Sequence, residues 1–396
     1  MIDSKLEERN HHVSYSDPVL SSSVTVEFES SQRLLEEIRE TGMARADAKK
    51  LVQDLCRRTS TAVGEIAQQH TLHSGRAPLR KGDRIDLEGH APVYTLVYHR
   101  KKWKKPFCIK LNSTHYDKLR AMIMRVHGSS LRLTEAGKAT KVTHAFHLLL
   151  MVLLLRYSSL SGGQLLLDLR GGGMQGAVHG DVFQVLREMF PDGPLLECFG
   201  SPLNAYLPSF GSAFPEDLDW HFGSIGNFLY ERVAEGCCEA NPPFSPGMMS
   251  ETAARIEYNI AQADERNAML TFVVIVPSAG DDKDSQRAAA KRFGGVSLKK
   301  MTTSSNCRIH ILLSAKEHGY VEGAQHMRPT RYKESLYDTS VIVLQSMQAR
   351  RQELDTVRLE EKIREAFASR HRDEVERRKK DDDTKAEDES DASESI

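Results

Sequence analysis

The sequence predicts an α/β protein in which helices cover a buried sheet. Residues 270–276 (LTFVVIV) are apolar almost throughout and rich in β-branched side chains, with none of the alternation of a half-exposed strand. Such a run is typical of a strand that is buried on both faces. Residues 309–313 and 340–344 repeat the pattern. Because helical periodicities, as at 248–263, alternate with these strands, the pattern favours an α/β sheet.

Composition divides the 396 residues into four parts. Residues 1–30 are rich in Ser and charge without a clear period, and we expect them to be disordered. Residues 31–160 form a predicted helical domain with a strand at 93–98. The sheet-bearing domain follows at 161–347. Residues 348–396 are predicted to form a charged helix, about 350–380, and a disordered acidic tail.

Several classes of protein are disfavoured. The net charge of -1 says nothing about a nucleic-acid partner. Six cysteines without a C-x-x-C pair indicate no zinc site, and we expect no metal. The longest strongly apolar run, 148–155, is far shorter than the ~20 residues that span a bilayer. With a polar start at 1–17 and no secretory leader, we expect a soluble, intracellular protein without membrane partners.

The candidate catalytic residues are Asn241-Pro242-Pro243-Phe244. They follow a predicted strand end, where α/β folds place ligands. Two prolines fix two φ angles and remove two amide donors, so their carbonyls can be held as acceptors. The N6 amine of adenine is a poor nucleophile because its lone pair is delocalised into the ring. Acceptance of both N–H groups, by the Asn241 side-chain oxygen and the Pro242 carbonyl, would localise that lone pair. Phe244 can stack on the purine.

This arrangement predicts methylation of adenine N6 with S-adenosylmethionine as donor. Methyl transfer is an in-line displacement from a sulfonium, so alignment supplies most of the rate. No strong base is needed, because the alkylated adeninium loses its proton readily. An ordinary Asn-Pro-Pro turn is the alternative interpretation of the same four residues.

A second motif, ECFGSPLN at 197–204, is a predicted strand that ends in a turn of small residues. Such a turn lets backbone amides approach a ligand closely. It lacks G-x-G-x-G, and a tight structural turn is the alternative. The predicted cofactor-binding residues here are Glu197, Cys198, Phe199, Gly200, Ser201, Pro202 and Asn204.

Several motifs occur together in a fixed order. Between residues 197 and 244 stand ECFGSPLN, SAFP, FGSIG and EANPPF, followed by LTFVVIVP at 270–277 and by EHGY with QH at 317–326. Over roughly residues 145–345 this order resembles the cap-specific adenosine N6-methyltransferase family, also known as the phosphorylated-CTD-interacting factor.

The resemblance implies a Rossmann-like methyltransferase sheet with a helical N-terminal domain. It implies S-adenosylmethionine as donor and, as substrate, mRNA whose 7-methylguanosine cap is followed by adenosine. The implied location is the nucleus, with the cytoplasm as the alternative. Residues 241–244 would contact the adenine and 197–204 the cofactor. The RNA side would be lined by Lys316, Glu317, His318, Gly319 and Tyr320.

The chain departs from the family pattern at three positions. Pro246 stands where the family has an acidic residue near the cofactor, Ala279 where it has a tryptophan near the substrate, and Lys316 where it has an aromatic residue. The two tryptophans, Trp103 and Trp220, lie far apart. We therefore expect the family without its WW domain, and no support for binding to the polymerase tail.

Two basic segments could contact the phosphates of a capped RNA. One is HRKKWKK at 99–105, and the other is a loop containing Arg76, Arg80, Lys81 and Arg84. A solvated basic surface is the alternative for both. For the whole chain, the alternatives are an N6-adenine methyltransferase of internal RNA or DNA and an inactive RNA-binding scaffold of the same fold.

Overall fold

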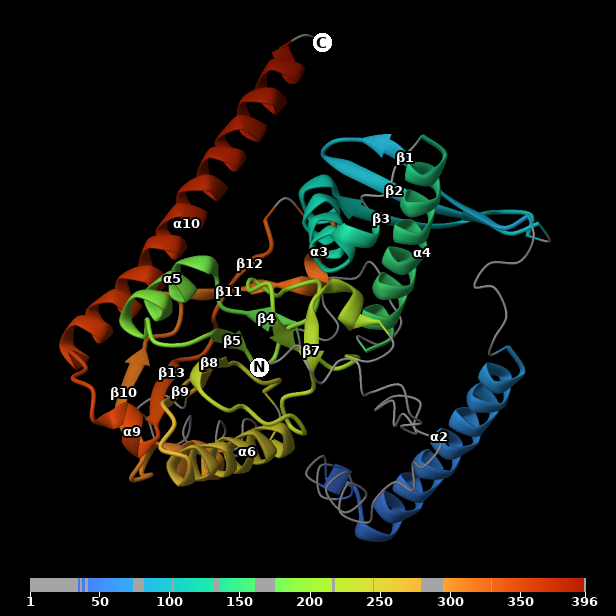
Figure 1. Ribbon diagram of the computed structural model, residues 1–396. Coiled ribbons are helices and arrows are strands. Elements are labelled where there is room, and N and C mark those ends of the chain that lie inside the picture. Colours follow the sequence, from blue (N-terminus) through green and yellow to red (C-terminus); the bar gives the residue numbers. More distant parts are fainter. Residues whose placement is uncertain are drawn as a thin grey trace. The chain divides into compact units, whose positions relative to one another are not determined.

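The computed structural model describes residues 35, 38–39, 42–73, 82–101, 103–131, 136–160, 175–215, 218–244, 246–278, 295–328 and 330–394. The chain divides into two compact units, 1–82 and 83–396. The first contains helix α2 (Arg45–His73) (Figure 1). The candidate site lies entirely within the second.

A seven-stranded sheet forms the centre of the second unit. Its order is β10 (Cys307–Leu313), β13 (Thr339–Gln345), β9 (Leu270–Pro277), β8 (Gly236–Ala240), β5 (Leu195–Glu197), β6 (Phe210–Gly211) and β7 (Ser224–Gly226). Every pairing from β9 to β7 is parallel. β13 pairs antiparallel with both of its neighbours, so it runs against the other six strands.

The predicted α/β class is confirmed as a mixed α/β architecture with a mostly parallel central sheet. The runs at 270–276 and 340–344 are β9 and β13, and every residue of both strands is buried. The sequence pattern did not reveal that β13 is reversed. A continuous apolar run reports burial on both faces but contains no information about strand direction.

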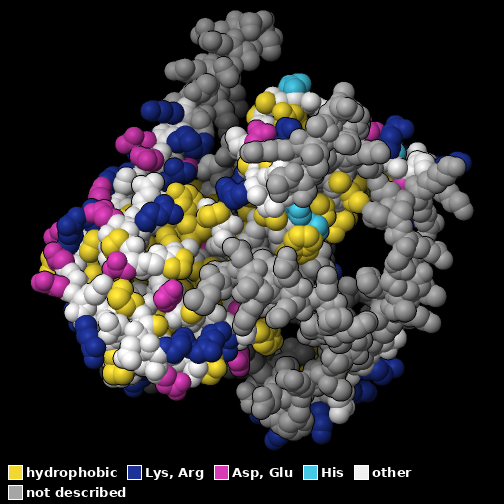
Figure 2. Space-filling model, in the orientation of Figure 1, with side chains coloured by type: hydrophobic (Ala, Val, Ile, Leu, Met, Phe, Trp, Pro, Cys, Tyr) yellow, Lys and Arg dark blue, Asp and Glu magenta, His cyan; other side chains and the backbone are white. Residues whose placement is uncertain are grey.

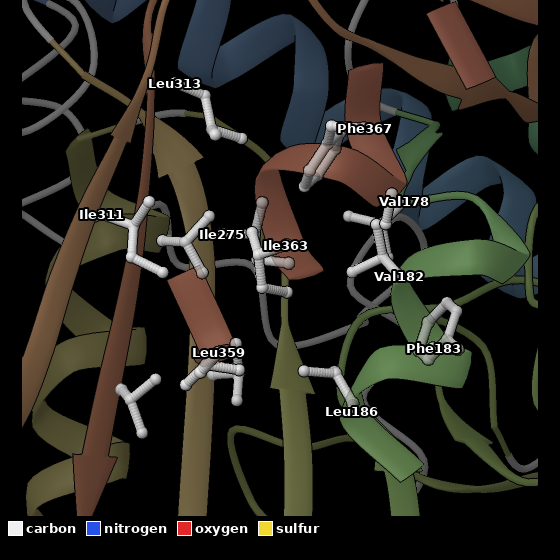
Figure 3. Packing of buried hydrophobic residues seen from close by; sticks show 14 of the residues in the cluster. Val178, Val182, Phe183, Leu186, Ile275, Ile311, Leu313, Leu359, Ile363 and Phe367 are labelled. Carbon is white, nitrogen blue, oxygen red and sulfur yellow. The ribbon is translucent and has the colours of Figure 1, made fainter. Parts of the chain in front are cut away.

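Two hydrophobic cores lie on opposite faces of the sheet. Successive residues of β9 pack into opposite cores: Val273 and Ile275 belong to the first core, and Phe272 and Val274 belong to the second. The first core includes α5 (Gly180–Met189) and α10 (Thr356–Glu394), and the second includes α6 (Pro246–Glu265). Figure 3 shows α10 side chains directed at both α5 and the sheet.

The C-terminal helix is longer than predicted. Short α9 (Met347–Arg350) precedes α10, which continues to Glu394, whereas the charge pattern predicted an end near residue 380. Its sequence contains neither glycine nor proline, and these are the residues that most strongly end a helix. A high density of charge therefore does not by itself end this helix.

A second, three-stranded sheet precedes two helices. Its strands β1 (Arg84–His90), β2 (Val93–His99) and β3 (Phe107–Asn112) form an antiparallel meander, followed by α3 (Ser113–Leu131) and α4 (Ala136–Leu160). Only β2 was predicted, because β1 is mostly exposed and mixed in composition. Among the described residues, no helix is long and apolar enough to cross a bilayer.

A third sheet is small but borders the candidate site. It has the order β12 (Tyr332–Glu334), β11 (Gly319–Glu322) and β4 (Gly176–Ala177). The remaining elements are the 3-10 turns η2 (Asp219–Phe222) and η3 (Gly323–Gln325) and the helix α8 (Gly295–Thr302). On the face drawn in Figure 2, acidic and basic side chains are interspersed, in keeping with the near-zero net charge.

We predict that Phe367→Ala in α10 lowers the free energy of unfolding by about 3–5 kcal/mol, the usual cost of emptying a large buried site. Phe367 is 1% exposed, and its ring lies 5.3 Å from that of His179 and 5.6 Å from that of His318. Val357→Ala, at a 67% exposed position of the same helix, is the control and should change stability by less than about 0.5 kcal/mol. Equal urea midpoints for the two variants would contradict this packing.

Candidate active site

The strand order places the candidate site at the centre of the main sheet. From β5 the chain proceeds through β6 and β7 on one side, then returns to β8 and β9 on the other (Figure 1). Ligands of open α/β sheets bind at such a reversal, outside the carboxyl ends of the strands. Glu197 ends β5, and Asn241 directly follows β8. The two motifs singled out in the sequence therefore meet at adjacent strand ends.

Asn241 has a defined orientation and one unused acceptor. Its side chain is 5% exposed, and its Nδ2 donates to the carbonyl oxygen of Gly176 at 3.3 Å. Its Oδ1 has no hydrogen-bond partner among the described residues. A buried polar atom without a partner is uncommon and calls for an explanation. An N–H group of a bound ligand would supply one.

Phe244 lies against an aromatic residue from the small sheet. Its ring centroid is 6.1 Å from that of Tyr320 in β11, in an edge-on arrangement. Pro242 is buried, while Pro243 and Phe244 are half-buried. Residues 241–244 and Tyr320, which the sequence assigned to the catalytic and RNA-binding sets respectively, are thus neighbours.

A chain of hydrogen bonds fixes Tyr320. Its hydroxyl lies 2.7 Å from Thr339 Oγ1, which lies 2.7 Å from His318 Nε2. His318 Nδ1 lies 2.7 Å from the carbonyl oxygen of Ser314. Because a carbonyl only accepts, we assign the proton of neutral His318 to Nδ1. Thr339 then donates to Nε2, and Tyr320 donates to Thr339.

The residues in this chain are held in their neutral forms. Burial lowers the pKa of His318 and raises the pKa of Tyr320, and both shifts favour the uncharged side chain. These hydrogen bonds therefore orient the Tyr320 ring, and none of the three side chains supplies a charge.

The rest of the EHGY motif is divided between the strand and its preceding turn. Gly319 is required by close approach, because a Cβ there would lie 2.4 Å from the Lys333 carbonyl oxygen. Lys316 adopts a left-handed conformation with φ 64°, and Lys316 and Glu317 are exposed.

The 197–204 turn is held by its own side chains. Glu197 Oε2 accepts from the backbone amides of Tyr206 and Leu207 at 2.9 and 3.1 Å. Asn204 Oδ1 accepts from the Ser201 amide at 2.7 Å, and Asn204 Nδ2 donates to the carbonyl oxygen of Gln175 at 3.1 Å. Two of the predicted cofactor-binding side chains, those of Glu197 and Asn204, therefore also maintain the turn.

Other residues of this motif pack away from Asn241. Cys198 and Phe199 belong to the second core, where the Phe199 ring lies 5.3 Å from that of Phe228. Burial raises the pKa of the Cys198 thiol well above its ordinary range, so it is a packing group. Pro202 is buried, and Gly200 is half-buried beneath Phe210.

Further positions from the sequence analysis fall elsewhere. Pro246 is the first residue of α6, a position that suits proline because no intrahelical amide donor is lost there. Arg76, Arg80 and Ala279 lie outside the described residues. In the basic segment 99–105, Trp103 is 46% exposed, and the Arg100 guanidinium lies 5.3 Å from its ring.

The sequence analysis did not single out several charged residues near the site. Glu239 in β8 is 2% exposed and is the register partner of Glu197. Lys118 in α3 donates to the Leu203 carbonyl oxygen at 3.2 Å, and Arg331 donates to the same atom. Burial lowers the pKa of Lys118 to about 7. The sequence signal for Glu239 was an acidic residue within the otherwise uncharged segment GCCEA. No sequence signal identified Lys118.

Fold and site together define the class, an α/β protein whose sheet and strand-end site are consistent with a methyltransferase fold. Residues 118–323, just over half of the chain, match the family described as "Phosphorylated CTD interacting factor 1 WW domain". The chain therefore belongs to the phosphorylated-CTD-interacting-factor family.

Two mammalian proteins are similar to part of this chain. They are the mRNA (2'-O-methyladenosine-N(6)-)-methyltransferases of Homo sapiens and Mus musculus. Each is 33% identical over 196 residues, which are 49% of this chain and 25% of the relative. The chain thus spans about a quarter of the length of the curated relatives it matches.

The family match corrects one expectation. The wide separation of Trp103 and Trp220 predicted a family member without its WW domain, but the matching family has that domain in its description. The prediction was wrong because it depended on the spacing of two tryptophans, whereas the match extends over α3 to η3. The expectation that the polymerase tail is not bound depended on the missing WW domain, so it loses its basis as well.

We predict that Glu197→Gln removes a pH-dependent loss of stability. Burial raises the pKa of folded Glu197 from 4.5 to about 7, so its favourable contribution is complete below pH 4.5 and disappears as pH rises to 7. Over that range the wild type should lose about 1–3 kcal/mol relative to the variant. Urea unfolding at several pH values measures the difference. Glu235→Gln, at an exposed position, is the control, and parallel curves for wild type and Glu197→Gln would refute the prediction.

Proposed function

We propose that this chain is an S-adenosylmethionine-dependent methyltransferase with a Rossmann-like sheet. Its proposed substrate is the N6 amine of the adenosine that follows the 7-methylguanosine cap of mRNA. The observation that carries this proposal is the buried, unpartnered Asn241 Oδ1 at the carboxyl end of β8, beside the end of β5. The names of the two mammalian relatives support the same reaction.

Asn241 and its neighbours would bind the adenine. With Nδ2 engaged by Gly176, the amide oxygen is directed as an acceptor for one N–H of the amine. The carbonyl of Pro242 would accept the other. Phe244 would stack on the purine face, and the edge-on contact with Tyr320 would hold its ring in position. These contacts localise the lone pair of the amine and align it.

Residues at the strand reversal fit a donor. S-adenosylmethionine, when bound, supplies a methyl group activated by a sulfonium. The buried atoms Glu239 Oε1 and Asn241 Oδ1 lack partners among the described residues and lie beside the 197–204 turn. Glu197, Gly200, Ser201, Pro202 and Asn204 would shape the floor of the site. The protein's own contribution is alignment, and the neutral Tyr320–Thr339–His318 chain supports that role.

The capped RNA would extend over more exposed residues. Lys316 and Glu317 lie in the turn before β11, and the segment 99–105 presents basic side chains beside Trp103. We propose these for phosphate and cap contacts, and the expectation for Arg76 and Arg80 stays a prediction from the sequence. Incubation with donor and a capped, adenosine-initiated oligonucleotide, followed by mass spectrometry, tests the reaction. Equal methylation of uncapped RNA would instead identify an internal N6-adenine methyltransferase.

We predict that Asn241→Ala abolishes methyl transfer while affinity for the capped oligonucleotide stays within about threefold. The substitution removes an acceptor for the reacting amine, whereas the phosphate contacts dominate RNA affinity. Single-turnover kinetics and fluorescence anisotropy measure the two effects, and circular dichroism controls for folding. A variant with normal turnover would remove Asn241 from the mechanism.

We predict that Phe244→Leu raises the Michaelis constant for capped RNA. Leucine keeps apolar contact with Tyr320 but has no aromatic face, and stacking of one base contributes about 1–3 kcal/mol. The expected increase is therefore roughly 5- to 150-fold. Steady-state kinetics at saturating donor provide the measurement, and unchanged constants would show that Phe244 does not stack on the adenine.

A further inference from the structure

Two buried glutamates lie side by side beneath the candidate site. Glu197 of β5 and Glu239 of β8 are register partners on adjacent parallel strands, and they are 1% and 2% exposed. They lie on the same face of the sheet, because the flanking Leu195 and Cys237 both belong to the first core. Two ionisable side chains therefore share one buried location.

The two carboxyl groups differ in their hydrogen bonds. Glu197 uses Oε2 to accept two backbone amides. Glu239 Oε1 is buried and has no hydrogen-bond partner in the described part of the chain. Asn241, whose Oδ1 is also unpartnered, stands two residues further along, directly after the end of β8. Two buried acceptors without partners therefore stand two residues apart at the carboxyl end of β8.

No cation neutralises Glu239 among the described groups that act on it. The groups that interact electrostatically with Glu239 are Glu197, the thiols of Cys198, Cys237 and Cys238, and the Tyr320 hydroxyl. The electrostatic effect of Lys118 in α3 falls on Glu197. Burial and the adjacent Glu197 raise the pKa of Glu239 well above its ordinary range. An ionised carboxylate here would be costly, unless a positive charge accompanied it.

We propose that Glu239 is a positioning residue for the methyl donor, whose sulfonium its carboxylate faces, and that donor binding releases a proton from the Glu197–Glu239 pair to solvent. This inference rests on the proposed function. Asn241, which would hold the acceptor amine, is about 7 Å along the strand from Glu239. The methyl group must lie next to that amine, so the positive sulfur lies within reach of Glu239. The carboxylate thereby compensates the charge that the sulfonium brings into a buried site.

Calorimetry tests the proposal with two ligands that differ in one charge. S-adenosylhomocysteine has the same amino-acid and nucleoside groups as S-adenosylmethionine but a neutral sulfur. Glu239→Gln should weaken S-adenosylmethionine on the order of 10- to 100-fold, the range of a charge-assisted contact. Binding of S-adenosylhomocysteine should change by less than about threefold. Glu235→Gln, exposed just before β8, is the matched control and should bind both ligands as the wild type does.

Proton release provides a second readout that a merely structural role would not move. Titrations in phosphate and in Tris, which differ in ionisation enthalpy, should reveal release in the wild type and none in Glu239→Gln. Wild-type affinity for S-adenosylmethionine should also rise between pH 6 and pH 8. Equal weakening of both ligands, or unchanged proton release, would overturn the proposal while leaving the proposed function intact. A folded wild type that binds neither ligand would overturn both.

Discussion

The two motifs at the candidate site depend on one short stretch of backbone, Gln175–Gly176. The carbonyl oxygen of Gly176 orients Asn241. The carbonyl oxygen of Gln175 accepts from Asn204 and from the amide of Gly323, and its side chain lies 2.7 Å from Ser201 Oγ. These two residues, at the entry to β4, thus fix the turn after β5 and the side-chain amide of Asn241 after β8 relative to each other. Displacement of this segment would disturb both at once.

Buried carboxyl groups distinguish this site from the rest of the sheet. Most strands of the sheet contribute apolar side chains, yet the central pair places Glu197 and Glu239 next to each other, with Tyr320 close by. Such an arrangement costs stability when it holds no ligand. The favourable free energy of ligand binding can offset this cost in stability. The site therefore combines a rigid, neutral aromatic side with a carboxyl pair that responds to charge.

Part of the fold could be predicted because its signals are long and continuous. β9 and β13 have seven or more buried residues each, and α5 and α6 show clear helical periods. β4 and β6 contain two residues each, which is too short for any period to appear. The adjacency of β5 and β8 is a finding of the structure, whereas the placement of Glu197 and Asn241 at carboxyl strand ends followed from their positions after short apolar segments. The burial of Glu239 did not, since it depends on partners distant in sequence. The predicted binding roles of these residues stay predictions.

The reversal of β13 has a consequence for how this family can vary. Because it runs against its neighbours, Thr339 at its start pairs with Pro277 at the end of β9 and so reaches the edge of the sheet that carries the candidate site. A parallel strand would have delivered its last residue there. Insertions between β12 and β13 would therefore change the rim that carries the candidate site, whereas insertions between β13 and α9 would change the opposite rim. A change in the length of the first connection can thus alter the candidate site without disturbing the strand order of the sheet.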